Sequence, residues 1–191
     1  NVALRVEDTD KERSKKEYEQ DIFEEFAWLG ITPDEGPQEG GLYQPYRQSE
    51  RTELYKKYLT KLFEQGSAYY CFCTKDELKA IKEEAMEKGS SQHYSGKCRT
   101  LSITEQQEKR KMGITPTVRF HVPEQEVGFT DLIQGKITFP AKTYGDFVIL
   151  RSDGVPTYNF AAALDDHLMN ISHVLRGNDH LSNTPKQILI Y

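Results

Sequence analysis

The last third of the chain constrains the fold most, because it combines a helix, a short strand and a second helix. Residues 158–169 carry apolar side chains at helical spacing, which predicts an amphipathic helix. Residues 173–175 are a short apolar run that predicts a strand, and residues 184–187 match a capping box with proline at the first helical position. This order is typical of α/β folds, in which ligands bind beyond the carboxyl ends of strands. Arg176, directly after the predicted strand, is therefore suited to clamp a carboxylate or a phosphate.

The first third of the chain repeats this alternation of strand and helix. Residues 2–6 form an apolar run typical of a buried strand in a parallel sheet, and Glu7 follows it directly. A capping box at residues 14–17 predicts one amphipathic helix, and a second amphipathic helix follows Ser49. We therefore predict an α/β fold built on a Rossmann-like parallel sheet.

The middle of the chain has a different character. It begins with a predicted strand at residues 68–71, after which capping boxes at residues 74–77 and 102–105 predict two charged or polar helices. Four further strand candidates, separated by turn signals, lie at residues 117–122, 127–131, 136–139 and 147–150. We interpret the chain as a first part of the sheet domain, an inserted α/β subdomain and a second part of the sheet domain, with boundaries at residues 1–68, 69–155 and 156–191.

Composition narrows the class of protein. The 191 residues include 37% hydrophobic and 29% charged side chains, with a net charge of −5, which is typical of a soluble globular protein. No run approaches the roughly 20 apolar residues of a membrane span, and Asn1 begins no signal peptide, so we expect a cytoplasmic protein without membrane contact. The chain starts without methionine in a strand pattern and ends at Tyr191 in a helix pattern. We therefore expect it to be a piece of a longer protein.

The three cysteines indicate a metal site rather than a secreted disulfide framework. Cys71 and Cys73 are separated by one residue, and Cys98 follows after a predicted helix and a polar loop. A structural zinc site needs four tetrahedral donors, and either Tyr94 or His93 is available as the fourth. Three buried free thiols are the alternative.

Four motifs, spread over the whole chain, occur in a specific order. They are Leu-Arg-Val-Glu-Asp-Thr-Asp at 4–10, Pro-Tyr-Arg-Gln-Ser-Glu-Arg at 45–51, Tyr-Asn-Phe-Ala with Asp-Asp-His-Leu-Met within 158–169, and Leu-Arg-Gly-Asn-Asp-His with Asn-Thr-Pro within 175–185. Together they resemble the catalytic core of the bacterial-type glutamyl-tRNA synthetases, a class I aminoacyl-tRNA synthetase family. The His-Ile-Gly-His and Lys-Met-Ser-Lys-Ser motifs of that family would fall outside these residues. The resemblance thus implies that the 191 residues by themselves do not activate glutamate.

The resemblance also implies roles for individual residues. Arg176 would bind the side-chain carboxylate of L-glutamate, Glu7 would accept hydrogen bonds from its ammonium group, and the Tyr158 hydroxyl would face the substrate. Asp179 and His180 would lie at the adenosine part of ATP.

Each of these residues also has an ordinary structural alternative. Arg176 would instead form an ion pair with Asp179 or Asp166, Glu7 would interact with a helix N-terminus, and Tyr158 would pack in the core. His180 would be a packed or capping residue.

The activity that the resemblance implies has two steps. ATP, assisted by Mg²⁺, first converts L-glutamate to glutamyl-adenylate, and the glutamyl group then passes to the terminal adenosine of its tRNA. No side chain acts as a covalent nucleophile, so catalysis would depend on positioning and electrostatic stabilisation. We expect the protein to act as a monomer.

The inserted subdomain meets the tRNA acceptor stem in the family. Its candidate phosphate contacts are Lys97 and Arg99, with Arg13 from the first part of the chain, and a solvated surface is the alternative for these side chains. The family also has a zinc site here in some members. Because Thr100 stands where some members have histidine, Tyr94 is the better fourth ligand beside Cys71, Cys73 and Cys98.

Two other functions compete with this interpretation. The tRNA-modifying paralogue that attaches glutamate to queuosine is the nearest, but Thr9 and the segment at residues 156–159 resemble the synthetase instead. A non-catalytic zinc module that binds RNA would need aromatic or basic platforms, and it leaves the pairing of Glu7 with Arg176 unexplained.

Overall fold

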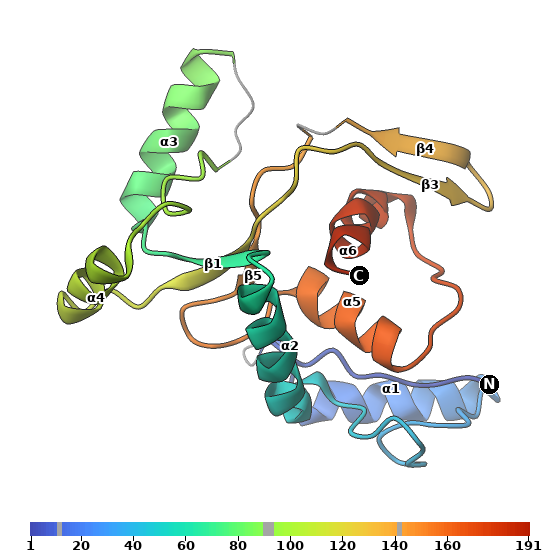
Figure 1. Cartoon of the computed structure of the whole chain (residues 1–191). Coiled ribbons are helices and arrows are strands. Elements are labelled where there is room, and N and C mark those ends of the chain that lie inside the picture. Colours follow the sequence, from blue (N-terminus) through green and yellow to red (C-terminus); the bar gives the residue numbers. More distant parts are fainter. Residues whose placement is uncertain (11–12, 90–93, 141–142) are drawn as a thin grey trace.

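The computed structural model describes residues 1–10, 13–89, 94–140 and 143–191 (Figure 1). Among the helices in these ranges, none combines the length and the apolar character that crossing a membrane requires. The elements, in chain order, are α1 (Lys16–Trp28), the 3-10 helix η1 (Gln48–Arg51), α2 (Thr52–Glu64), β1 (Ala68–Cys71), α3 (Lys75–Glu87), α4 (Ile103–Lys111), β2 (Thr117–Phe120), β3 (Val127–Asp131), β4 (Gly135–Phe139), β5 (Val148–Leu150), α5 (Tyr158–Leu168), the 3-10 helix η2 (Asn178–Asn183) and α6 (Thr184–Ile190).

The strands form two antiparallel units. One is a three-stranded sheet in the order β1-β2-β5, and the other is the β3-β4 hairpin, which lies beside α6 (Figure 1). The strand predictions at residues 68–71 and in the four segments between 117 and 150 are confirmed. In β3 and β4 more buried and exposed residues alternate, as in antiparallel strands that bury one face, whereas β2 is buried along most of its length.

Parallel pairing is limited to two isolated bridges within the described ranges. The segment at residues 2–6 makes them, one to Glu35 and one to Arg47. The strand predicted at residues 173–175 was wrong, since this segment has no assigned strand and Leu175 is 95% exposed. A run of apolar residues becomes a strand only where a neighbouring strand offers hydrogen-bond partners, and no described strand lies there to pair with it.

The core draws on all three predicted parts of the chain. A large apolar side chain such as Val, Leu, Ile or Phe stabilises a fold by roughly 1.5 to 3 kcal/mol when it is fully buried. The proposed division at residues 68 and 155 therefore crosses a shared core, and it stays a prediction. The buried cluster contains Tyr55, Leu59, Ala68, Val118, Phe120, Val122, Ile149, Phe160, Ala161 and Leu164.

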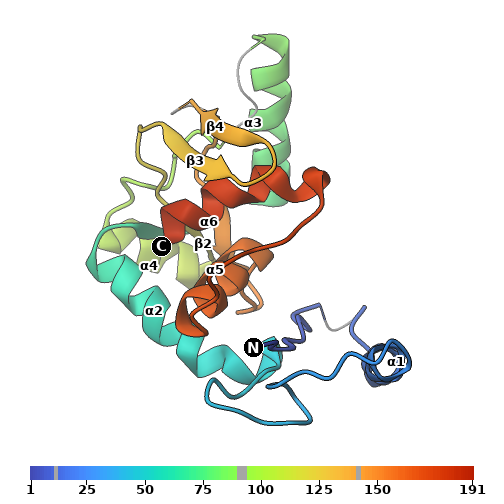
Figure 2. The same ribbon diagram turned by 90° about the vertical axis from the view of Figure 1, so that its right-hand side faces the viewer.

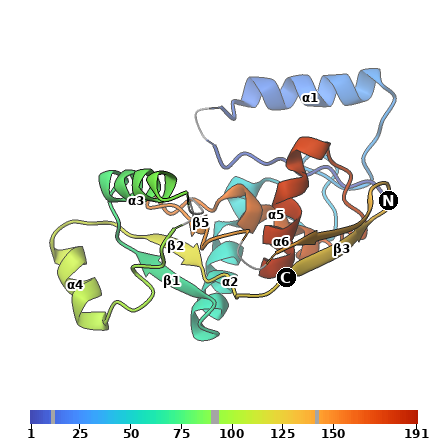
Figure 3. The same cartoon turned by 90° about the horizontal axis from the view of Figure 1, so that it is seen from above.

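Helix α1 lies apart from this core (Figures 2 and 3). None of its residues is buried, and Tyr18 and Ile22 on its apolar face are 51% and 43% exposed. An ion pair between Arg47 Nη2 and Glu19 Oε1, 2.7 Å apart, connects α1 to the loop before α2. The predicted helix is present, but the described part of the chain leaves its apolar face largely uncovered.

The predicted capping boxes of the first and middle parts of the chain were correct only where the helix begins directly after a residue whose side chain can accept a hydrogen bond. The capping boxes at residues 74–77 and 102–105 are both complete. The box predicted at residues 14–17 was wrong, because α1 begins at Lys16 with Lys15 as its N-cap. A lysine side chain has no acceptor for the free amides of the first turn.

Candidate functional site

A cavity of about 380 Å³ lies between the N-terminal segment, the start of α5 and the segment before η2. Its lining includes Glu7, Tyr158 and Arg176, the residues predicted to bind glutamate. Tyr158 is the first residue of α5 and is 43% exposed, so it is not a core residue. Neutral side chains, among them Ala162 and Met169, complete much of the wall. The volume suits a small polar molecule.

Arg176 is held by two neutral acceptors. Its Nη2 donates to Gln187 Oε1 at 2.7 Å, and its Nη1 donates to Thr184 Oγ1 at 3.3 Å. The alternative ion pairs are not formed, because Asp166 pairs with Arg5 and Asp179 pairs with His180.

The capping box predicted at residues 184–187 was also wrong, for a related reason. Asn183 is the N-cap of α6 and makes no side-chain cap, and Pro185 lies within the first turn. The hydroxyl of Thr184 and the amide oxygen of Gln187 both accept from Arg176 instead. A tertiary contact thus uses the side chains that the local pattern assigned to capping.

Arg5 is a cavity residue that the sequence reasoning missed. Its Nη1 donates to Asp166 Oδ1 at 2.6 Å, and its Nη2 donates to Glu7 Oε1 at 2.9 Å. Burial by itself would lower the pKa of Arg5, but the hydrogen bonds to Glu7 and Asp166 outweigh it and raise that pKa. In an extended strand, alternate residues face the same side, so the spacing of Arg5 and Glu7 was the available signal.

A fully buried carboxylate, Asp165, anchors the wall behind the cavity. It accepts from Gln48 Nε2 at 3.0 Å, from Arg51 Nε at 2.7 Å and from the Tyr55 hydroxyl at 2.8 Å. Arg5 Nε lies 4.0 Å from it. These contacts tie η1 and α2 to α5, which explains what the polar residues of the motif at 45–51 do in the fold.

The residues predicted at the ATP site lie outside the cavity lining. Asp179 and His180 are in η2, where their side chains are 78% and 58% exposed and 3.4 Å apart. They follow Arg176 by three and four residues in the chain and are exposed to solvent.

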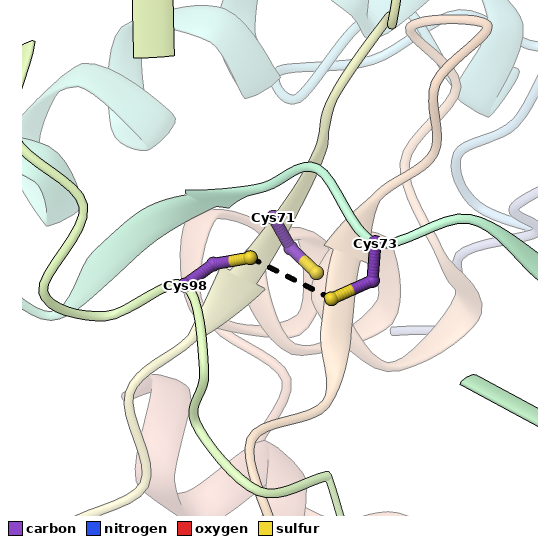
Figure 4. A group of neighbouring side chains, drawn as sticks. All are labelled: Cys71, Cys73 and Cys98. Carbon is purple, nitrogen blue, oxygen red and sulfur yellow. Dashed lines mark hydrogen bonds between the residues drawn. The ribbon is translucent and has the colours of Figure 1, made fainter. Parts of the chain in front are cut away.

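The three cysteines converge at the end of β1 (Figure 4). Their Sγ atoms lie within 4.8 Å of one another, with 3.6 Å between Cys73 and Cys98. The Tyr94 hydroxyl lies 3.3 Å from Cys73 Sγ and 3.5 Å from Cys71 Sγ. The other candidate fourth donor, His93, lies outside the described residues.

The surroundings of the cysteine cluster shift the pKa values of Cys71 and Cys73 in opposite directions. Burial raises the pKa of Cys73. Burial also acts to raise the pKa of Cys71, but its hydrogen bonds with Tyr94, the Cys73 backbone and Arg119 outweigh burial and lower that pKa. The Arg119 guanidinium also lies 3.9 Å from the centre of the Tyr94 ring. A cationic group beside a cluster of thiols favours the thiolate form that binds metals.

The family is decided by a match over the whole chain. A family model described as tRNA synthetases class I (E and Q), catalytic domain, matches residues 1–191. The chain belongs to this family.

Curated relatives of this class I synthetase chain agree with the match. The chain is 54% identical over 188 residues to the glutamate–tRNA ligase of Sulfurihydrogenibium sp. (strain YO3AOP1), and the match covers 98% of this chain and 39% of that protein. It is 51% identical over 189 residues to the glutamate–tRNA ligase of Bacillus licheniformis, with coverage of 98% and 39%. The chain thus spans about two fifths of the length of these relatives.

A solved structure confirms the fold class of the synthetase chain. The glutamate tRNA ligase from Elizabethkingia meningosepticum, solved in complex with its amino acid, superposes with a TM-score of 0.89 and 36% identity. The match covers 99% of this chain and 39% of that one. The α/β catalytic core of class I synthetases, predicted from the motifs, is therefore confirmed.

Arg99, a candidate tRNA contact of this synthetase chain, forms an internal ion pair. Its Nε and Nη2 lie 2.5 and 2.6 Å from the carboxylate oxygens of Asp146, which is 2% exposed. Tyr69 and the Val122 amide also donate to Asp146. Burial would raise the pKa of Asp146, but these hydrogen bonds lower it. No local motif marked Asp146, so sequence reasoning missed it.

The other two candidate tRNA contacts are exposed. Lys97 Nζ lies 2.7 Å from Glu77 Oε1, and its side chain is 56% exposed. Arg13 Nε lies 2.6 Å from Asp10 Oδ2, and its side chain is 86% exposed. Exposed ion pairs of this kind are weak enough to exchange partners.

Proposed function

We propose that this chain is part of a glutamate–tRNA ligase and that its cavity binds L-glutamate. The observation that carries the proposal is the lining of one cavity of about 380 Å³ by Glu7, Tyr158 and Arg176. L-Glutamate has an ammonium group and two carboxylates, so a site for it needs an anion and a cation that can hold opposite ends. The names of the relatives and the solved relative in complex with its amino acid support the same substrate.

Arg176 is the receptor for the side-chain carboxylate in this proposal. A guanidinium group binds a carboxylate through two parallel hydrogen bonds and discriminates by charge against the amide of glutamine. Glu7 accepts hydrogen bonds from the ammonium group, and the Tyr158 hydroxyl faces the substrate from the start of α5. Arg5, which holds Glu7 by an ion pair of 2.9 Å, orients that carboxylate.

The complete reaction uses ATP with Mg²⁺ and then tRNA. The α-carboxylate of glutamate attacks the α-phosphorus of ATP, and pyrophosphate leaves. A ribose hydroxyl of the terminal adenosine of the tRNA then takes the glutamyl group from the adenylate, and AMP leaves. Asp179 and His180, exposed in η2 beyond Arg176, are our candidates for contacts with the adenosine of ATP. We also propose that the protein acts as a cytoplasmic monomer.

We propose a structural zinc site formed by Cys71, Cys73, Cys98 and Tyr94. Zinc–sulfur bonds of about 2.3 Å at tetrahedral angles require sulfur atoms about 3.8 Å apart. The 3.6 Å between Cys73 and Cys98 and the Tyr94 hydroxyl at 3.3 and 3.5 Å from two thiols fit this geometry. The metal would join the end of β1 to the loop before α4. Zinc analysis of protein purified without chelator tests the site, and a result without zinc would contradict it.

The proposed tRNA contacts are basic residues of the predicted insertion and of the first part of the chain. Lys97 and Arg13 are exposed and form ion pairs with the half-buried carboxylates of Glu77 and Asp10, and a phosphate can replace those partners. Arg99 forms an ion pair with the buried Asp146. We propose that only the exposed edge of the Arg99 guanidinium contacts the phosphate backbone.

The names of the relatives favour the synthetase over both alternatives. Relatives matched over 98% of this chain, including those from Sulfurihydrogenibium sp. and Bacillus licheniformis, are called glutamate–tRNA ligases.

The test is calorimetric titration of the chain with L-glutamate and with a non-hydrolysable glutamyl-adenylate analogue. Arg176→Ala should weaken both by roughly tenfold or more, because it removes hydrogen bonds to a charged group. Arg13→Ala, at an exposed ion pair outside the cavity, is the matched control and should bind like the wild type. Equal affinities in Arg176→Ala and the wild type would remove Arg176 from the pocket.

A further inference from the structure

The charge of Arg176 is uncompensated, unlike that of the other arginine in the cavity. Arg5 is shared between two carboxylates at 2.6 and 2.9 Å. Arg176 has only the neutral oxygens of Gln187 and Thr184 as hydrogen-bond partners, and no described carboxylate forms an ion pair with it. Of these two cations, Arg176 is therefore the one with a full charge to offer an incoming anion.

Gln187, which accepts a hydrogen bond from Arg176, is buried with one of its polar atoms unpaired among the described residues. Gln187 is 4% exposed, and its Oε1 accepts from Arg176 at 2.7 Å, but its Nε2 is buried without a hydrogen-bond partner in the described part of the chain. A buried unpaired amide destabilises a fold. Glutamate has the same shape and would form a stronger charge-assisted bond to the guanidinium, although its second oxygen would take the unpaired place of Nε2. A carboxylate at this position would therefore pair with Arg176 more tightly than the amide does, yet the chain has glutamine.

We infer that Gln187 is a specificity-determining positioning residue, which holds the Arg176 guanidinium in the cavity while leaving its positive charge available to a carboxylate ligand. This inference rests on the proposed function, in which that ligand is the side chain of L-glutamate. The neutral amide oxygen orients the guanidinium, since it accepts a single hydrogen bond at Nη2. A carboxylate in its place would neutralise the guanidinium, and the cavity would lose its preference for an anion over an amide.

The test compares the affinities for L-glutamate and L-glutamine by calorimetry in a set of variants. Gln187→Glu keeps the shape of the side chain and adds a negative charge, and Gln187→Met removes the acceptor without adding charge. Ser182→Glu, at an exposed position in η2, adds the same charge without contacting Arg176 and is the control. Arg176→Ala reports on the proposed function itself.

The decisive quantity is the ratio of the affinity for L-glutamate to the affinity for L-glutamine. Gln187→Glu should lower the preference for glutamate over glutamine by at least roughly tenfold while the variant remains folded, because the new carboxylate neutralises the guanidinium. Gln187→Met should weaken glutamate binding but retain the preference, and Ser182→Glu should change neither. A purely structural role predicts instead that Gln187→Glu and Gln187→Met weaken both ligands in the same proportion.

The outcomes separate this inference from the proposed function. Loss of the preference in Arg176→Ala together with an unchanged preference in Gln187→Glu would overturn the role of Gln187 and leave the glutamate site standing. Equal binding of glutamate by Arg176→Ala and the wild type, or no binding by the wild type, would overturn the glutamate site and the inference with it.

Discussion

Replacing Arg51 with methionine should destabilise the chain by about 3 to 5 kcal/mol, the cost of breaking a buried ion pair from one side. Arg51 is 3% exposed, and its Nε lies 2.7 Å from the fully buried Asp165. Methionine fills much of the same volume, so the loss reflects charge and hydrogen bonding more than packing. Without Arg51, the only described cation near Asp165 is Arg5, whose Nε is 4.0 Å away.

The same substitution removes two more hydrogen bonds. Arg51 Nη1 donates to the backbone oxygens of Tyr43 and Pro45 at 2.9 and 2.7 Å. Leaving a buried acceptor without a partner costs about 1 to 3 kcal/mol, but Tyr43 and Pro45 are only half-buried, so water can take the place of Arg51 at their carbonyls. The buried carboxylate therefore dominates, and the expected loss is a large fraction of a typical domain stability of about 5 to 15 kcal/mol.

The measurement is urea unfolding followed by circular dichroism, with the midpoint compared at constant slope. Arg13→Met is the matched control, because Arg13 is 86% exposed in its ion pair with Asp10 and should lose less than about 1 kcal/mol. Asp165→Asn combined with Arg51→Met should cost less than the sum of the single variants, because the pair is removed together. A loss in Arg51→Met no larger than that in Arg13→Met would refute the reasoning.

Three further predictions concern residues 69–155, which the sequence predicts to be an inserted subdomain. The pKa of Asp146 is lowered in the fold, so its contribution to stability is present above the unfolded pKa of about 3.9 and is lost as pH falls through the native value. Acid titrations of the unfolding free energy should therefore show a smaller loss below about pH 4 in Asp146→Asn than in the wild type, and parallel curves would contradict this. Thr74→Ala should lower the unfolding free energy by about 1 kcal/mol, because it removes the N-cap of α3, and an unchanged urea midpoint would count against that cap. Tyr94→Phe should weaken zinc binding in competition with a chromogenic chelator, and equal affinity would exclude the Tyr94 hydroxyl as the fourth ligand.

The features that could be predicted from the sequence are those with local causes. Both boxes in the middle of the chain, at residues 74–77 and 102–105, involve side chains three residues apart, so neighbours in the sequence are also neighbours in space. The β3-β4 hairpin and the strands before and after it were likewise predicted from short strand segments separated by turn signals. The motifs that carry the family resemblance were enough to place Glu7, Tyr158 and Arg176 together, and one cavity is lined by all three.

What the sequence by itself determined was the family, the helices and strands with local signals, and the candidate ligands of one cavity and one cysteine cluster. Only the tertiary structure decided which partners the charged side chains take. Arg5 pairs with Asp166, which lies 161 residues later, and Arg176 engages the side chains that a local pattern assigned to a helix cap. The physical reason is that an ion pair or a strand requires its partner to be at hydrogen-bonding distance, and for distant segments that distance is set by the packing of the whole chain.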